Sequence, residues 1–237
     1  MKTIALVTGA NKGLGKQTVR RLAAQGWTVW LGARDPERGA ATARELAAGG
    51  ADVRYVALDV TSDESVQAAV KVLDAEHGRL DALVNNAGIT GGRVAPAETG
   101  PDDFRACYET NVFGPVRVTR AFLPLLHRST RPRVVMVSSG MGSLAVTTDP
   151  KRLESGIVSL VYPSSKAALN MITSQYAKAL PDIKINAVDP GYTATDLNAH
   201  RGHKTVEQGA EVIVRLATIS ADGPTGGYFD EDGPLPW

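Results

Sequence analysis

Short apolar runs recur along the chain, and longer stretches with helical spacing of apolar positions separate them. Most of the runs are continuous rather than alternating, which is typical of strands buried on both faces of a parallel sheet. The pattern predicts strands at residues 3–8, 28–32, 52–58, 82–84, 133–138, 184–188 and 227–229. It predicts helices at residues 14–25, 36–48, 63–76, 101–127, 162–180 and 205–218.

Strands and helices alternate, with crossovers long enough to join parallel strands by right-handed connections. The sequence therefore predicts an α/β fold, a single-domain Rossmann-type doubly wound parallel sheet of about seven strands with helices on both faces. Two long irregular stretches, 140–161 and 192–204, follow predicted strands. Because sheets of this kind bind ligands beyond the carboxyl ends of their strands, both stretches are expected at the active edge.

Composition and charge exclude some functions. The 237 residues include 26 Lys and Arg against 25 Asp and Glu, a net charge of +1, so no global field favours nucleic acid or an anionic membrane. No run approaches ~18 apolar residues, and the N-terminal run is too short for a signal peptide, so we expect no membrane span. Cys107 is the single cysteine, which excludes an intrachain disulfide and is compatible with a cytoplasmic location.

The sequence TGANKGLGK, from Thr8 to Lys16, joins the first predicted strand to the first predicted helix. Glycine-rich turns in that position hold phosphate groups at the helix N-terminus. A triphosphate-binding loop needs a glycine and a hydroxyl where this chain has Ala10 and Gln17. The glycine spacing instead suits a dinucleotide pyrophosphate, although a tight turn without a ligand remains an alternative on spacing alone.

Tyr162 and Lys166 share one face of a predicted helix because they are four residues apart. A phenol with a pKa near ~10 is a poor acid–base group at neutral pH. A neighbouring ammonium stabilises the phenolate, and we expect it to lower the pKa of Tyr162 toward the range useful for proton transfer to a carbonyl oxygen. The same spacing also occurs by chance on exposed helices.

Further motifs lie near the ends of predicted strands. The sequence NNAG at residues 85–88 follows the fourth strand, Ser138 and Ser139 end the fifth, and Pro190 and Gly191 follow the sixth. With Asn111, the glycine-rich turn and the Tyr-x-x-x-Lys pair, these motifs resemble the classical short-chain dehydrogenase/reductase family in order and spacing. The resemblance covers nearly the whole chain. The segments VNNAGI, LGARDPERG and TVEQGAE are most similar in style to carbonyl reductases of that family.

The resemblance implies a catalytic set of Asn111, Ser139, Tyr162 and Lys166. Ser139, the second serine of its pair, would bind the substrate carbonyl, and Tyr162 would act as general acid and base. Lys166 would reach the hydroxyls of the nicotinamide ribose. Asn111 would hold a water that links Lys166 to solvent. Asparagine is unusual inside a helix, because its side chain competes with the backbone for hydrogen bonds.

The resemblance also implies a dinucleotide-binding half over about residues 1–130 and a catalytic half over about 131–237. Asp59 would accept a hydrogen bond from the adenine amino group, helped by the backbone of Val60. Asn86, Ala87 and Gly88 would line the adenosine ribose. The other expected cofactor-binding residues are Gly9, Asn11, Lys12, Gly13, Leu14, Gly15, Arg34, Tyr162, Lys166, Pro190, Gly191, Thr193 and Thr195.

The second predicted strand indicates which nicotinamide cofactor is bound. Enzymes of this fold that choose NAD commonly place an acid at the end of this strand, where the chain has Ala33 followed by Arg34. Arg34 and Lys12 would both favour a 2′-phosphate, so we expect NADP(H) rather than NAD(H). Asp35 keeps the alternative open, because a register slip of one or two residues would turn an acid toward the ribose.

The chain departs from the family pattern between the catalytic serine and tyrosine. Ser139 and Tyr162 are 23 residues apart, where most members have about a dozen. Residues 147–156 therefore form an insertion, as carbonyl reductases have in a longer form. It would shape the substrate entrance or block a helix face used for oligomerisation, so both a monomer and a homo-oligomer remain open. Trp237 would cover the cleft or pack against a partner.

The motifs predict an oxidoreductase that transfers a hydride between NADP(H) and a small-molecule carbonyl or alcohol. The alternative is a catalytically idle cofactor-binding sensor or scaffold, which would not need all four catalytic residues. The expected substrate walls, 91–98, 143–161 and 192–204, carry no dense basic cluster, which favours a small or medium apolar carbonyl compound. His200 and His203 lack the further ligands that a metal site needs, so no metal is expected.

Overall fold

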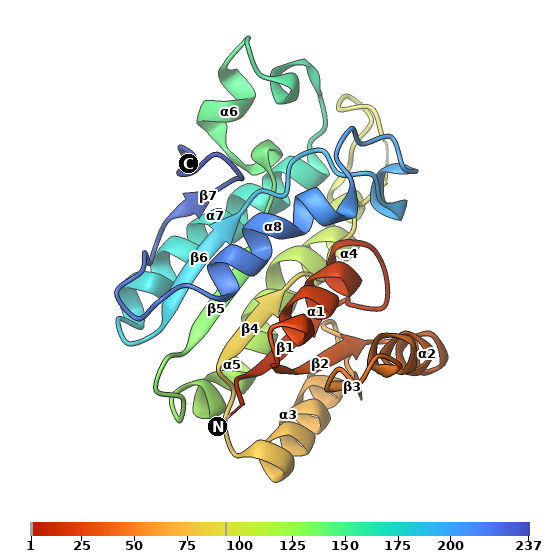
Figure 1. The fold of residues 1–237 in the computed structure, drawn as a ribbon. Helices are drawn as coiled ribbons and strands as arrows, with labels where there is room; N and C mark the ends of the chain where they lie inside the picture. The colour runs from red at the N-terminus through yellow and green to blue at the C-terminus, as the bar shows by residue number, and fades with distance from the viewer. Residues whose placement is uncertain (1, 93) are drawn as a thin grey trace.

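The computed structural model describes residues 2–92 and 94–237. Seven parallel strands form one sheet in the order β3-β2-β1-β4-β5-β6-β7 (Figure 1). The strands are β1 (Ile4–Thr8), β2 (Thr28–Ala33), β3 (Val53–Ala57), β4 (Ala82–Asn85), β5 (Arg133–Val137), β6 (Lys184–Val188) and β7 (Tyr228–Phe229). The predicted sheet is confirmed, and each strand begins and ends within one residue of its expected position.

The strand order reverses between β1 and β4, which are hydrogen-bonded neighbours at the centre of the sheet. The connections after these two strands leave in opposite directions and open a crevice at the carboxyl edge. In doubly wound sheets, ligands bind in the crevice at this switch point. The glycine-rich loop after β1 and the residues 85–88 after β4 therefore face the same crevice.

Two layers of helices cover the sheet (Figure 1). The first packs on one apolar cluster through residues such as Leu22, Ala43 and Ile213. The second packs on the other face through residues such as Leu73 and Phe122. The first layer holds α1 (Gly13–Ala24), α2 (Pro36–Ala47) and α8 (Val206–Ala217), and the second holds α3 (Asp63–His77), α5 (Gly114–Leu126) and α7 (Val161–Ala179).

The helix expected at 101–127 is not continuous. It consists of α4 (Pro101–Tyr108), a π-helical segment (Glu109–Phe113) and α5. A π-helical turn holds one extra residue relative to an α-helix, so it rotates the side chains that follow and is often found at functional sites. Asn111 lies at its centre.

The stretch expected to be irregular at 140–161 contains local structure. It holds a 3₁₀ turn (Gly140–Gly142), the short helix α6 (Leu144–Thr148) and a second 3₁₀ turn (Leu153–Gly156). We call residues 144–160 the inserted segment. The C-terminal residues lie beside it (Figure 1), and the Ala145 amide donates to the Trp237 carbonyl at 3.4 Å. Directly before the segment, the Ser143 hydroxyl donates to the Pro236 carbonyl at 2.8 Å. The rings of Tyr228 and Trp237 stack with centroids 5.4 Å apart.

Within residues 2–92 and 94–237, no helix has the length and apolar character needed to cross a bilayer.

Gly39 of α2 marks a close approach between that helix and β3. A Cβ atom placed there would overlap the ring of Tyr55. We expect Gly39→Ala to lower the free energy of unfolding by about 1–3 kcal/mol, as overpacking of a filled site does. Gly49→Ala is the matched control, because a Cβ at Gly49 meets nothing within 4 Å. Urea denaturation of both variants tests this, and equal stabilities would contradict the proposed contact.

Candidate active site

The glycine-rich loop positions free backbone amides at the N-terminus of α1. Gly9 has φ +61° and Gly13 has φ +53°, both in the left-handed region that favours glycine. Lys12, the residue before the helix, makes no side-chain capping bond. The first amides of α1 are therefore available to an anion, and the helix dipole favours a negative charge there.

The NNAG segment packs under this loop. The Asn86 side-chain amide donates to the carbonyls of Thr8 at 2.9 Å and Gly9 at 3.2 Å. A Cβ at Gly15 would lie 2.6 Å from that amide nitrogen, and a Cβ at Gly9 would lie 2.8 Å from the Ala87 Cα. Only glycine fits at either place, because the Asn86–Ala87 segment packs directly against the loop and fixes its shape.

Arg34 directly follows β2 and is exposed. In the described part of the chain its guanidinium forms no ion pair. Asp35 has a separate role as the N-cap of α2, where its carboxylate accepts from the Arg38 amide at 3.0 Å and pairs with the Arg38 guanidinium at 3.3 Å. The arrangement directs the arginine, and not the acid, toward the open end of the strand.

A contact between Lys12 and a 2′-phosphate requires a free ammonium, but the Lys12 ammonium is already paired. Its ammonium lies 2.6 Å from the Asp196 carboxylate, which also pairs with His200 at 2.9 Å. These groups lower the pKa of Asp196, the hydrogen bond from Lys12 being the main cause. All three side chains are exposed, and ion pairs of that kind stabilise a protein by little. The pair links the glycine-rich loop to the loop after β6.

The remaining residues expected at the adenosine end lie at the sheet edge. The Asp59 carboxylate accepts from the amide and hydroxyl of Thr61 at 2.9 and 2.8 Å. Val60 is buried, and a Cβ at Gly114 would lie 3.0 Å from it. The Asn11 carbonyl accepts from the Thr42 hydroxyl at 3.0 Å. Leu14 packs toward α8, where a Cβ at Gly209 would lie 2.8 Å from it.

Asn111 is fully buried in the π-helical segment. Its side-chain carbonyl accepts from the Ile89 amide at 2.9 Å, and its side-chain amide donates to the Ile89 carbonyl at 2.8 Å. It also donates to Ser165 at 3.1 Å. The extra residue of the π turn gives Asn111 this position, where it satisfies the backbone of the loop after β4.

Lys166 is buried and donates to the Val137 carbonyl at 2.7 Å. The position that a Gly88 Cβ would occupy lies 3.7 Å from its ammonium nitrogen and 3.4 Å from the Asn111 carbonyl oxygen. The structure therefore brings these three expected residues together. Burial lowers the pKa of Lys166 to about 8, although the charges of Cys107 and Asp189 act in the opposite direction.

The expected lowering of the Tyr162 pKa is wrong for the protein without a ligand. Burial raises the pKa of the Tyr162 phenol well above its usual range, and a hydrogen bond with Ser139 only partly offsets this. The Lys166 ammonium lies 5.6 Å from the centre of the Tyr162 ring, but its hydrogen bond goes to the backbone of β5. Desolvation of the phenolate therefore outweighs the nearby positive charge.

The two serines after β5 have different environments. Ser138 is buried and its hydroxyl donates to the Asn170 side chain at 2.6 Å. Ser139 is partly exposed, accepts from the Met141 amide at 3.3 Å, and shares a hydrogen bond with Tyr162. Only Ser139 is open to the crevice beside Tyr162, as the sequence pattern predicts.

The loop after β6 returns across the crevice. Thr195 reaches the glycine-rich loop, because a Cβ at Gly13 would lie 3.6 Å from its methyl group. Thr193 is buried and its hydroxyl donates to the Pro190 carbonyl at 3.1 Å. Gly191 has φ +71°. The loop thus brings Thr195 to the expected cofactor crevice, whereas the Thr193 hydroxyl is used within the loop itself.

A family model for the short chain dehydrogenases matches residues 3–206. The chain belongs to the short chain dehydrogenase family. Short-chain dehydrogenase/reductase 1 of Saponaria officinalis is 35% identical, over 100% of this chain and 96% of that protein. The (+)-neomenthol dehydrogenase of Capsicum annuum is 32% identical over 95% of this chain and 94% of its own. The NADPH-bound carbonyl reductase from chicken fatty liver superposes with a TM-score of 0.88 at 27% identity, over 100% of both chains.

Membership of the short chain dehydrogenase family answers the question that the glycine-rich loop raises. The family consists of oxidoreductases that bind a nicotinamide cofactor, so the loop belongs to a dinucleotide fold and not to a triphosphate-binding one. The left-handed turns at Gly9 and Gly13 and the free amides of α1 fit such a cofactor. Among the described residues, no group of three or more histidine, cysteine or acidic side chains could hold a metal ion.

Sequence analysis missed three residues of this short chain dehydrogenase that lie close to Ser139. Asp189, Glu154 and Tyr228 come from the end of β6, the inserted segment and β7. A Cβ at Gly140 would lie 2.8 Å from a Glu154 carboxylate oxygen and 3.0 Å from one of Asp189. An acid directly before Pro190 is a signal that would have pointed to Asp189. Nothing in the sequence pairs it with Glu154.

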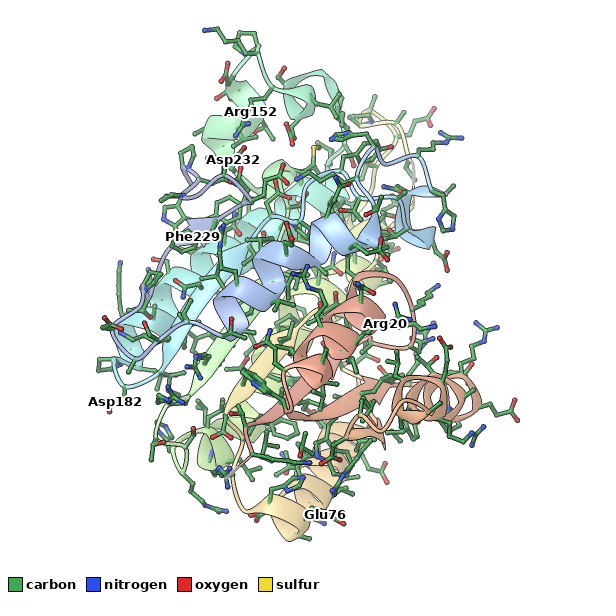
Figure 2. The ribbon with its side chains drawn as sticks, in the orientation of Figure 1. Arg20, Glu76, Arg152, Asp182, Phe229 and Asp232 are labelled. Carbon is green, nitrogen blue, oxygen red and sulfur yellow. The ribbon has the colours of Figure 1, made fainter. Side chains whose placement is uncertain are left out.

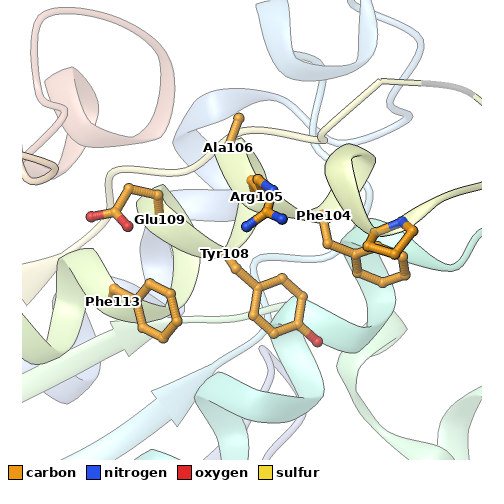
Figure 3. A pocket seen from close by; sticks show the side chains of 7 residues that line it. Phe104, Arg105, Ala106, Tyr108, Glu109 and Phe113 are labelled. Atoms are coloured by element: carbon orange, nitrogen blue, oxygen red, sulfur yellow. The ribbon is translucent and has the colours of Figure 1, made fainter.

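Two hollows on the surface do not coincide with the catalytic groups. The larger, about 560 Å³, lies over α4 and the π-helical segment and contains none of the expected site residues (Figure 3). Asn111 belongs to the same segment but its side chain is turned inward. The smaller, about 270 Å³, lies between α1 and the loop after β6 and includes Gly13 and Thr195. The second hollow is therefore continuous with the expected cofactor crevice.

Burial of the Lys166 ammonium gives a pH dependence of stability. Because the folded-state pKa is about 8, below the ~10.4 of an exposed lysine, the unfolded chain binds more protons between these values. The contribution of Lys166 to the free energy of unfolding should therefore rise with pH from about 8 to about 10. The pKa of Cys107 is raised by burial and opposes this rise within the same range, and the raised pKa of Tyr162 opposes it at higher pH. Urea denaturation of the wild type and Lys166→Met isolates the effect. Lys178→Met, exposed on the same helix, is the control and should keep the rise. The same pH dependence in the wild type and in Lys166→Met would contradict the buried charge.

Proposed function

We propose that this protein transfers a hydride between NADP(H) and a carbonyl or alcohol substrate, with Tyr162 as the general acid and base. The observation that carries the proposal is the convergence of Ser139 and Tyr162, which share a hydrogen bond, with Lys166 close to the Tyr162 ring. A cofactor-binding module without catalysis would not need this arrangement.

The proposed reaction uses each of these side chains differently. The bound nicotinamide supplies or accepts the hydride at the carbonyl carbon. The Ser139 hydroxyl would donate a hydrogen bond to the carbonyl oxygen and orient the carbon for attack. The Tyr162 hydroxyl would then give its proton to that oxygen as negative charge develops there. In the reverse direction, Tyr162 would take the proton from the alcohol.

The buried phenol suits the proton-donating direction. Burial keeps Tyr162 protonated across the physiological range by raising its pKa, and the hydrogen bond with Ser139 offsets this only in part. Lys166 would bind the ribose hydroxyls and supply positive charge beside the phenolate that remains after proton transfer. Its lowered pKa, about 8, leaves it mostly charged at neutral pH.

Three observations support NADP(H) over NAD(H). Arg34 is exposed at the end of β2 and has no ion pair among the described residues, and Asp35 caps α2. The structurally similar carbonyl reductase from chicken fatty liver is described as NADPH-bound. Lys12 would need to leave Asp196 before it could contact a phosphate.

The inserted segment supports an apolar substrate. It exposes several large apolar side chains beside the start of α7, and their exposed fractions range from 42% to 77%. They are Leu144, Leu153, Ile157, Val158 and Leu160. A relative is named for neomenthol, a small apolar alcohol. We therefore propose a small or medium apolar ketone, aldehyde or alcohol as the substrate.

Replacement of Tyr162 tests the proposed reaction. Tyr162→Phe should lower kcat for NADPH-dependent carbonyl reduction by about 10²–10⁴-fold, because the general acid is lost. The assay is NADPH absorbance with a panel of apolar ketones and aldehydes. Tyr176→Phe, on the same helix, is the control and should keep wild-type activity. Wild-type turnover that survives in Tyr162→Phe would exclude Tyr162 as the acid, and no turnover with any substrate would favour a cofactor-binding protein.

Cofactor choice has its own test. Arg34→Ala should raise the Kd of NADPH by about tenfold or more, as loss of one charge-assisted hydrogen bond does, while the Kd of NADH stays nearly constant. Calorimetric titration measures both constants. Arg38→Ala is the matched control, since that arginine is occupied by Asp35. Equal losses for NADPH and NADH in Arg34→Ala would contradict the phosphate assignment.

A further inference from the structure

Two carboxyl groups from distant parts of the chain meet beside the turn that carries Ser139. Asp189 follows β6 and is only 8% exposed, and Glu154 lies in the inserted segment. One oxygen of each is within 3.0 Å of the position that a Gly140 Cβ would occupy. The two side chains therefore converge on the same side of the Ser139–Gly140 turn, and the missing side chain of Gly140 leaves room for both.

Asp189 joins the ends of two neighbouring strands. Its carboxylate accepts from the Gly191 amide at 2.9 Å, and the Gly140 amide also donates to it. The first amide belongs to the turn after β6, and the second to the turn after β5. One carboxylate thus sets the position of Ser139, which is expected to bind the substrate carbonyl, relative to the loop expected to hold the nicotinamide.

The surroundings of the two acids do not balance two negative charges. Lys204 faces Asp189 from the loop after β6, but its ammonium lies 2.6 Å from Glu231. Lys166 of α7 also faces Asp189, whose charge raises the pKa of Lys166 against the effect of burial, but its ammonium donates to the Val137 carbonyl at 2.7 Å. Tyr162 of α7 and Tyr228 of β7 face Asp189 as well, and both are neutral phenols whose pKa is raised.

Tyr228 gives an independent sign of this environment. Its ring is 1% exposed, and within residues 2–92 and 94–237 its hydroxyl has no hydrogen-bond partner. The charges of Asp189 and Glu154 both raise its pKa, after burial as the main cause. An unpaired buried hydroxyl beside two carboxyl groups is a donor available to the pair.

We propose that Glu154 and Asp189 share one proton, so that the protonated carboxyl donates to the other carboxylate and fastens the inserted segment over Ser139 and Tyr162. Both are positioning residues, since they act through the turn that carries Ser139. Only the catalytic consequence of this pair rests on the proposed function.

We call the pair of Glu154 and Asp189 with its shared proton the clasp, and the proposal predicts how this pair responds to pH. Burial is the main cause that raises the pKa of Asp189. Its bonds to the Gly191 and Gly140 amides lower the pKa, the charge of Glu154 raises it by less than these bonds lower it, and the charge of Lys204 lowers it slightly. An acid whose pKa is raised by folding stabilises the folded state below the ordinary carboxyl pKa and loses that contribution as the pH rises through the raised value. The second charge then repels the first, and the inserted segment is released.

Carbon-13 NMR of the labelled carboxyl groups tests the shared proton without any substrate. In the wild type, one of the two groups should titrate well above the ordinary range of ~4. In Glu154→Gln the repulsion is gone and the amide donates to Asp189, so Asp189 should titrate at lower pH. Asp182→Asn is the control, because Asp182 lies at the far end of the molecule from Arg152 of the inserted segment (Figure 2). An Asp189 titration that is the same in the wild type and Glu154→Gln would overturn the pair.

Hydrogen exchange of the amides in 144–160, corrected for intrinsic rates, tests the clasp. Wild-type protection should fall as the pH rises, Glu154→Gln should stay protected, and Glu154→Ala should be unprotected throughout. Gly140→Ala should resemble Glu154→Ala, because its methyl group would meet both carboxylates. Protection in Glu154→Ala equal to that of the wild type at low pH would overturn the clasp.

Kinetics test the positioning role. Asp189→Ala should lower kcat by about 10–100-fold, since small displacements of reacting groups have effects of that size, with a smaller change in the KM of the cofactor. Asp189→Asn keeps one acceptor and one donor and should restore most of kcat. Unchanged kcat in Asp189→Ala would overturn the positioning role. If the wild type has no reductase activity, the proposed function is refuted but the shared proton is not. The titration and exchange results test the shared proton separately.

Discussion

The geometry of the site depends on one hydrogen bond, which the buried ammonium of Lys166 donates to the Val137 carbonyl at 2.7 Å. A charge placed there loses most of its hydration and must be compensated by fixed dipoles. The compensation comes from the backbone at the end of β5, so the first turns of α7 are tied to that strand. Tyr162 starts the same helix and Ser139 follows the same strand, and the lysine therefore fixes the distance between them.

The other site residues reach this contact because parallel strands end at one edge of the sheet. Gly88 follows β4, Ser139 follows β5 and Asp189 follows β6, so residues as far apart in sequence as Gly140 and Asp189 become neighbours. Only Asn111 comes from the middle of a helical region, and it does so through the π-helical segment. Its two bonds to Ile89 keep the loop after β4 close to Lys166 without a strand to support it.

Most of the fold could be predicted from the sequence, because continuous apolar runs and glycine or proline punctuation are local signals. The break of the helix at Asn111 could not, since a π turn depends on tertiary bonds to Ile89 and not on propensity. The protonation of Tyr162 was also mispredicted. Spacing on a helix shows that an ammonium is near, but the sign of a pKa shift depends on burial, which only the packed structure reveals. The approach of Glu154 and Asp189 to the same side of Gly140 brings together segments whose proximity no local pattern encodes.

The contacts between the inserted segment and the C-terminal residues have a consequence for protein engineering. Because the Ala145 amide donates to the Trp237 carbonyl at 3.4 Å and the neighbouring Ser143 hydroxyl donates to the Pro236 carbonyl at 2.8 Å, the two segments are in direct contact although they are far apart in the gene. A chimera that receives the inserted segment of a relative without that relative's final residues would lose both contacts at once. Exchange of substrate preference between members of this family is therefore best attempted as a paired transplant of both segments.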